Sequence, residues 1–372
     1  MQWSMDPAGA VATGADDDAA RPLMAPPLAA PGAVMRDALD DDPVEQHLID
    51  RVVGVFHDAG YAVDRAEIVG YYVSLKTNPF VLLAGPQGTG KRDFVSLFAE
   101  GLLGAGSAQL VRIASGGAWL DATGHDQFYR AFVGRFTSLQ FVDTLREAAE
   151  PRCRSRLYLV AFDALRPEEF TSFFTTLLAV DDAGRMLLTI PGAGTVGAIT
   201  LPENVLLTAT IDTAAYSPAL TREVARHAAL IAFREPRRAA PNRRAALPPP
   251  PGYQWSWRHA TIRDPVRARA RLAAVLGAEQ LTRLHCSPGL ARLLWQGGIV
   301  LGGAALTGIT LHVANSFDRR GRGLYDPGDP LRNAQQAYDA QVIQRVLWRT
   351  RHVVEPELRA AIAAWPAAHG GT

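Results

Sequence analysis

Short apolar runs alternate with amphipathic stretches along most of this chain, a pattern that predicts a parallel β-sheet covered by helices. Apolar runs with the length of buried strands lie at 80–84, 109–113, 157–162 and 205–211. Stretches with helical spacing lie between or beside them, at about 91–103, 138–149 and 167–179. Two further alternating runs flank a Pro-Gly-Ala-Gly turn at 191–194 and predict a hairpin inserted before the last of these strands. The expected fold class is therefore α/β.

The same patterns divide the chain into four parts. Residues 1–43 are rich in Ala, Pro and Asp with little periodicity, which is typical of an unpacked, disordered segment. Two amphipathic stretches, one from Val44 and one opening with Asp64 and Glu67, predict helices that lead into an α/β domain at 44–234. A Pro- and Arg-rich linker and an all-helical domain of four or five helices are expected after it, at 235–264 and 265–365.

Composition excludes several classes of protein. With 372 residues, 48% of them hydrophobic, and a net charge of +1, the chain can form a soluble globular core and carries no overall signal for nucleic acid. Cys153 and Cys286 lie outside any Cys/His cluster, so neither a disulfide framework nor a zinc site is predicted. The uncharged stretch at 295–314 fits two buried helices joined by a turn better than a membrane span, and the acidic N-terminal region does not resemble a secretory leader. We therefore expect a cytoplasmic protein.

The stretch FVLLAGPQGTGKR, residues 80–92, carries the strongest candidate chemistry. It matches the phosphate-binding loop pattern G-x-x-x-x-G-K-[ST] through Lys91 and departs from it at Arg92. An apolar strand precedes the loop and a helix follows it, so backbone N–H groups and the Lys91 ammonium can converge on phosphate oxygens. The candidate nucleotide-binding residues are Gly85, Pro86, Gln87, Gly88, Thr89, Gly90, Lys91 and Arg92. The alternative is an ordinary glycine-rich turn between a strand and a helix.

A second acidic element is expected where a neighbouring buried strand ends. The run LYLVAFDAL places Asp163 at that point, where a carboxylate can hold Mg²⁺ through water. Ala164 follows, although an acid would be needed there to polarise an attacking water. The metal-side carboxylate is therefore present and the hydrolytic base is missing. The alternative is that Asp163 only caps a helix that follows the strand.

From about residue 45 to 350 the chain resembles the AAA+ ATPases of the McrB type, the nucleotide-driven motors of McrBC modified-DNA restriction systems. The similar segments are YYVSLKTNPFVLLAGPQGTGK at the domain start, WLDATG (119–124), LYLVAFDALRPEEF in the acidic motif, ENVLLTATIDTAAYSPAL in the sensor strand and YDAQVIQRVL (338–347) in the helical domain. The resemblance implies a P-loop NTPase (AAA+) fold, with a parallel sheet covered by helices on both faces and a C-terminal all-helical lid. It also implies that ATP or GTP binds between the two domains.

Several positions depart from the family's catalytic residues. The Ser/Thr that should follow the loop lysine is Arg92, the acidic-motif Glu is Ala164, and the sensor Asn is Asp212. The Asp-Arg pair whose arginine acts on a neighbouring subunit's nucleotide falls on Arg226-His227, with Arg222 nearby. The resemblance thus leaves four candidate catalytic residues, Asp163, Asp212, Arg222 and Arg226. Asp163 is also the candidate metal ligand, but the loop residue that would bind Mg²⁺ with it is absent.

Arg92 admits two interpretations. Its guanidinium can project toward the phosphates and supply part of the charge that Mg²⁺ would bring, or it can point into solvent from the first helical turn. A missing general base alone costs about a hundred- to ten-thousand-fold in rate. We therefore expect ATP or GTP to bind as a structural ligand that is turned over slowly or not at all.

The resemblance implies a subunit of a homo- or hetero-oligomeric AAA+ ring. A hydrolysis-impaired scaffold or regulatory subunit, beside an active AAA+ partner or a nuclease in phage defence or restriction, is the first hypothesis. One alternative is an active motor whose missing groups come from neighbours or from Asp163, Asp212, Glu168 or Glu169 in altered roles. The other is a nucleotide-free interaction scaffold. A strip of arginines and aromatics could bind nucleic acid, although a solvated linker is favoured: Arg237, Arg238, Arg243, Arg244, Tyr253, Trp255, Trp257 and Arg258.

Overall fold

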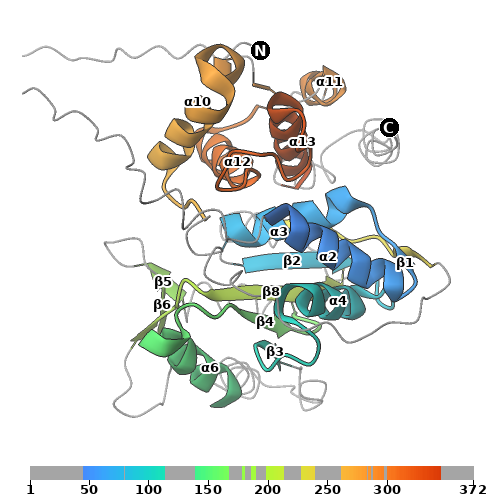
Figure 1. The fold of residues 1–372 in the computed structure, drawn as a ribbon, viewed down its shortest axis with the longest axis vertical. Helices are drawn as coiled ribbons and strands as arrows, with labels where there is room; N and C mark the ends of the chain where they lie inside the picture. Colours follow the sequence, from blue (N-terminus) through green and yellow to red (C-terminus); the bar gives the residue numbers. More distant parts are fainter. Residues whose placement is uncertain are drawn as a thin grey trace, which may run out of the picture.

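A five-stranded parallel sheet forms the centre of the molecule (Figure 1), in the order β3-β4-β8-β2-β9. The computed structural model describes residues 45–78, 80–113, 139–166, 178–180, 186–189, 198–212, 228–238, 261–282, 284–285, 288–296 and 300–344. The sheet comprises β2 (Phe80–Gly85), β3 (Leu110–Ile113), β4 (Tyr158–Phe162), β8 (Val205–Asp212) and β9 (Ala229–Ala232). The four strands predicted from apolar runs are confirmed, with their ends shifted by at most one residue.

Helices cover both faces of this sheet, and the side chains of β2 show why its sequence is apolar throughout. Phe80, Leu82 and Ala84 pack into the cluster that contains residues of α6 (Leu139–Ala149). Val81 and Leu83 point to the other face, into a cluster formed with three helices: α2 (Glu45–Asp58), α3 (Arg65–Thr77) and α4 (Lys91–Leu103). A strand buried on both faces has no polar face to alternate with. The mixed α/β class is confirmed.

Two smaller sheets accompany the central one. β1 (Tyr61–Ala62) pairs antiparallel with β10 (Arg237–Arg238), inside the stretch expected to be a linker. β5 (Leu178–Val180), β6 (Met186–Thr189) and β7 (Ala198–Thr200) form an antiparallel sheet, which confirms the hairpin. The helix expected at 167–179 is wrong at its C-terminal end, because Leu178 and its neighbours pair with β6 instead. Residues 167–177 lie outside the described residues.

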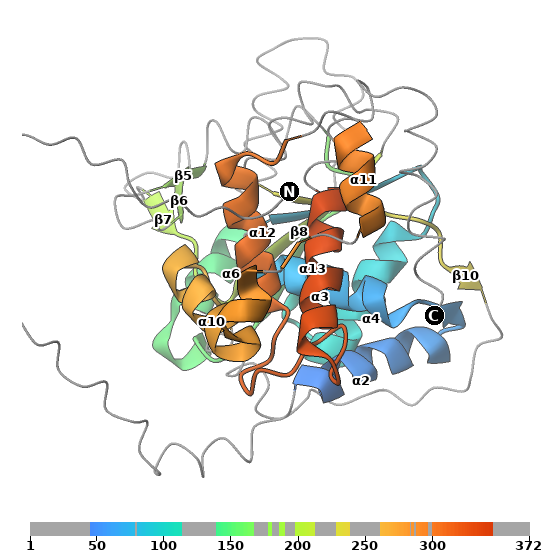
Figure 2. The ribbon, with the colours of Figure 1, turned by 90° about the horizontal axis from the view of Figure 1, so that it is seen from above.

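In the described part of the chain after β10, four helices follow: α10 (Pro265–Thr282), α11 (Pro288–Gln296), α12 (Gly303–Asn315) and α13 (Pro330–Val342). Their buried side chains, including Leu272, Ile309 and Val313, form a core of their own. Viewed from above, α12 and α13 lie over α3 (Figure 2). The expectation that 295–314 is buried is wrong at its start, because Trp295 is 78% exposed. No helix among the described residues is long and apolar enough to cross a bilayer.

The segment between α12 and α13 fixes the helical region to the α/β layer. Leu324 is fully buried and packs into the core formed by α2, α3 and α4. The Gln46 side chain donates to the Gly323 carbonyl, and Arg65 donates to the Leu324 carbonyl. The contact between the two regions therefore combines a buried apolar side chain with hydrogen bonds to backbone carbonyls that lie between two helices.

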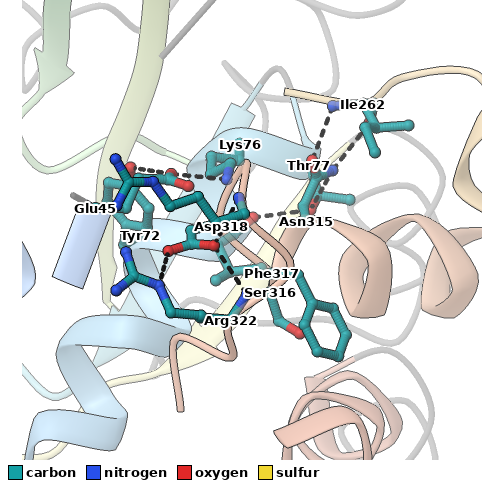
Figure 3. Close-up of polar contacts among 12 residues, drawn as sticks. Glu45, Tyr72, Lys76, Thr77, Ile262, Asn315, Ser316, Phe317, Asp318 and Arg322 are labelled. Atoms are coloured by element: carbon teal, nitrogen blue, oxygen red, sulfur yellow. Dashed lines mark hydrogen bonds and ion pairs between the residues drawn. The ribbon is translucent and has the colours of Figure 1, made fainter. Parts of the chain in front are cut away.

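A second set of contacts lies beside this segment (Figure 3). The Asn315 side chain accepts from the Ile262 N–H at 2.8 Å and donates to the Ile262 carbonyl at 2.9 Å. Asp318 is also buried and pairs with Arg322 at 3.0 Å. Asn315 also donates to Thr77 Oγ1, at the C-terminal end of α3, at 3.4 Å. These contacts hold the start of the helical region, α12 and the following segment together against that end of α3.

The Glu45–Lys76 ion pair joins α2 to α3 at the same interface (Figure 3). Lys76 Nζ lies 2.8 Å from Glu45 Oε1, and the two side chains are 0% and 4% exposed. The Tyr72 hydroxyl donates to the same oxygen at 2.6 Å. Burial lowers the pKa of Lys76, while the Glu45 carboxylate raises it. The pair is buried and holds α2 and α3 together.

Candidate phosphate-binding site

The predicted loop connects β2 to α4 at the carboxyl edge of the sheet. Gly88 and Gly90 have φ angles of +82° and +81°, a left-handed conformation in which a side chain is unfavourable. A Cβ on Gly85 would lie 2.8 Å from the Phe233 carbonyl oxygen, so only glycine fits where β9 passes the loop. The helix begins at Lys91, and the first N–H groups of a helix have no partner within it. The backbone thus has the form of an anion-binding turn.

Lys91 lies across this loop. Its Nζ atom donates to the carbonyl oxygens of Gly85 at 2.8 Å and Pro86 at 2.5 Å, and it lies 3.4 Å from Thr89 Oγ1. Thr89 in turn donates to the Pro86 carbonyl at 2.9 Å. Partial burial lowers the pKa of Lys91, whereas the Asp212 carboxylate raises it. The acceptors of the ammonium are therefore neutral oxygens, which anionic phosphate oxygens can replace.

The strand order brings the candidate acids to the same edge. β8 lies between β2 and β4, and Asp212 at its end pairs in register with Gly85. Asp163 directly follows β4, and its N–H donates to the Ile113 carbonyl of β3 at 3.1 Å. Parallel strands end at one edge of a sheet, where open α/β folds place their ligands. The structure therefore places Lys91, Asp163 and Asp212 at one edge of the sheet.

Asp163 is already occupied by arginine. Arg112 Nη1 lies 2.8 Å from Asp163 Oδ1 and 3.0 Å from Oδ2, so one guanidinium nitrogen serves both carboxylate oxygens. The other terminal nitrogen of Arg112 donates to the Arg92 carbonyl at 2.9 Å and to Ser96 Oγ at 2.5 Å. The guanidinium thus bridges the end of β4 and the first turns of α4.

Arg92 lies beside the same carboxylate. Its Nε atom is 3.4 Å from Asp163 Oδ2, and its side chain is 70% exposed. Neither interpretation of Arg92 from the sequence included this partner, since one directed it to phosphate and the other to solvent. In the structure Arg92 is a loosely held second guanidinium beside Asp163.

Arg112 is the site residue that the sequence did not reveal. It lies on β3, whose neighbour in the sheet is β4, with Arg112 in register with Ala161. A charged residue near the end of a short apolar strand is unusual and gives a weak signal. Arg112 can be assigned to the site only once β3 is known to lie beside β4, the strand that leads into Asp163.

These residues do not fit a magnesium site. Mg²⁺ prefers oxygen ligands in near-octahedral geometry and dehydrates reluctantly. Here the loop position that should offer a hydroxyl is Arg92, and both oxygens of Asp163 accept from Arg112. Among the described residues, no group of three or more His, Cys, Asp or Glu side chains is placed to hold a metal ion.

Ala164 occupies the position where a hydrolytic base would be expected. Its φ angle is +52°, and its N–H donates to Thr210 Oγ1 at 2.8 Å. The Leu165 N–H donates to the Thr210 carbonyl, also at 2.8 Å. β8 thereby fixes the turn after Asp163 through hydrogen bonds to backbone, and the Ala164 methyl group offers no proton acceptor.

The remaining candidates are only partly covered. Arg222, Arg226, Glu168 and Glu169 lie outside the described residues, as does the segment at 119–124. Of the arginine and aromatic strip, the structure describes Arg237 and Arg238. Both are exposed on β10, and the Arg238 guanidinium lies 5.6 Å from the centre of the Tyr61 ring. The two arginines therefore belong to a small sheet with β1, which provides no direct support for a nucleic-acid surface.

Comparison with known proteins adds no relative from which a role could be transferred. No protein-family model matches the chain, and no curated protein matches it at a significant level. Function must therefore be inferred from the strand–loop–helix geometry, from the lysine across the loop and from the arginines around Asp163.

Proposed function

We propose that this chain is a nucleotide-binding protein of the P-loop class that holds ATP or GTP with little hydrolysis. The observation that carries the proposal is the placement of Lys91 over a glycine-rich turn between β2 and α4. Phosphate oxygens would replace the Gly85 and Pro86 carbonyls as acceptors of the ammonium, and backbone N–H groups of the helix start would donate to them. The phosphates would lie at the carboxyl edge of the sheet.

Slow turnover follows from the residues around Asp163. Ala164 supplies no general base, and loss of such a base costs about 3 to 5 kcal/mol of transition-state stabilisation. Arg112 and Arg92 hold the carboxylate that the resemblance would assign to metal. The nucleotide would then act as a structural ligand that ties the loop, α4 and the end of β8 together.

The AAA+ resemblance extends this proposal to assembly. On that basis the chain would be a scaffold or regulatory subunit of a ring, alone or beside an active AAA+ partner, and it would serve in defence or restriction. Phosphate release in the presence of such a partner would favour the alternative of a motor completed by its neighbours.

Thermal unfolding with and without nucleotide tests the proposal. A nucleotide concentration about 1,000 times the dissociation constant should add about 4 kcal/mol to the free energy of unfolding. We expect ATP or GTP to raise the melting temperature of the wild-type chain. Lys91→Ala should lose most of that increase, whereas Arg146→Ala should keep it, because Arg146 lies on α6 and pairs with the exposed Asp143. An equal nucleotide-induced shift in the wild-type and Lys91→Ala proteins would contradict the proposal.

A further inference from the structure

We propose that the site binds nucleotide without a metal ion, and that Arg92 and Arg112 take the place of Mg²⁺. This inference rests on the proposed nucleotide binding and adds the chemical form of the ligand. The two guanidinium groups together carry the charge of one divalent cation, and both lie against Asp163. The nucleotide bound would therefore be the metal-free, more negatively charged form.

The first support is the fixed position of Arg112. Its side chain is 20% exposed, and its donors reach Asp163, the Arg92 carbonyl and Ser96 Oγ. A guanidinium with this many charge-assisted and neutral hydrogen bonds is held in one orientation. Mg²⁺ at Asp163 would either displace Arg112 and leave its guanidinium without this carboxylate, or place a divalent charge beside that guanidinium. Either outcome is unfavourable.

The second support is the freedom of Arg92. Its one contact with Asp163 is long, at 3.4 Å, and the side chain is largely exposed. Arg92 directly follows Lys91 in the first turn of α4, where phosphate is expected to bind. Arg92 can therefore move from Asp163 to a phosphate oxygen while Arg112 continues to neutralise the carboxylate.

Calorimetric titration of the full chain with ATP and GTP, in EDTA and in excess Mg²⁺, tests the inference. We expect the affinity in EDTA to equal or exceed that in Mg²⁺. A tenfold or greater loss of affinity in EDTA, about 1.4 kcal/mol, would overturn the metal-free site while leaving nucleotide binding in place. Absence of binding under both conditions would instead contradict the proposed function itself.

Substitution of Asp163 distinguishes the two kinds of site further. Asp163→Asn removes a negative charge beside the phosphates and releases both arginines, so we expect ATP to bind several-fold more tightly in EDTA, about 1 kcal/mol. A carboxylate that binds metal would give the opposite result, a loss of affinity in Mg²⁺. The control is Asp143→Asn, which removes the same charge from the exposed pair on α6 and should leave affinity unchanged.

Arg92→Thr provides a second test that does not depend on the fold tolerating a change at Asp163. Arg92 is exposed, so its loss should leave the melting temperature of the free protein nearly unchanged. We expect a roughly tenfold weaker affinity for ATP in EDTA, the size of one charge-assisted hydrogen bond. Unchanged affinity would overturn the role assigned to Arg92.

Discussion

Two clusters in this molecule each pair a carboxylate with cationic side chains, but they differ in burial. Glu45 and Lys76 are 4% and 0% exposed, with the Tyr72 hydroxyl donating to the same carboxylate. At the sheet edge, Asp163 is 15% exposed and its partner Arg92 is 70% exposed. The internal pair lies at the contact of α2, α3 and the helical region, whereas Arg92 of the second cluster faces solvent beside the loop between β2 and α4.

The difference teaches how burial separates structural charges from charges available to a ligand. A buried pair has paid its desolvation cost on folding, and removal of one partner leaves a charge without compensation. An exposed pair contributes little to stability and can exchange one partner for another at small cost. The Glu45–Lys76 pair is therefore part of the packing, and Arg92 is available to bind an anion.

The largest expected effect comes from breaking the internal pair. Glu45→Ala should lower the free energy of unfolding by about 3 to 5 kcal/mol, because it leaves the Lys76 ammonium buried without its carboxylate. Urea denaturation followed by circular dichroism measures this loss. The double variant Glu45→Leu/Lys76→Met should recover most of it. A loss below about 1 kcal/mol for Glu45→Ala would contradict a structural role for the pair.

Restoring the missing catalytic groups should have the next largest effect. We expect Arg92→Thr/Arg112→Gln/Ala164→Glu to release phosphate from ATP at least tenfold faster than Arg92→Thr/Arg112→Gln, with Mg²⁺ present in both assays, because only the former has a general base. Ala164 already has a φ angle of +52°, and Glu adds no backbone strain beyond that of any residue with a Cβ. Equal rates would show that more than these groups is missing.

The smallest effect is expected at the exposed end of the comparison. Arg92→Ala should change the free energy of unfolding of the ligand-free protein by less than about 1 kcal/mol. Urea denaturation under the same conditions as for Glu45→Ala measures the contrast directly. A loss as large as that of Glu45→Ala would mean that Arg92 is part of the packing and is not available to a ligand.

Sequence patterns predicted β2, the turn into α4 and the start of α3 because each pattern lies within a few neighbouring residues. The apolar run before the loop marks β2, and the glycines and Lys91 mark the turn into α4. Asp64 at the start of α3 accepts from the Ala66 N–H, as its position before a helical stretch suggests. In each case the residues that form the element also form the signal.

Other features could not be predicted because they depend on which segments become neighbours. Leu178 pairs with Leu188 in a strand that its own helical spacing did not indicate. Arg112 reaches Asp163 only because β3 lies beside β4. The exposure of Trp295 likewise depends on how α11 packs against the rest of the chain. Pairing between distant strands therefore determines which arginine reaches Asp163.

The most direct test of the central claim is a calorimetric titration of the metal-free, wild-type chain with ATP and GTP. The account predicts saturable binding of at least one of them in EDTA, at about one nucleotide per chain, that is lost in Lys91→Ala. No saturable heat with either nucleotide, or the same binding curve for Lys91→Ala, would contradict the claim that the loop between β2 and α4 holds a nucleotide.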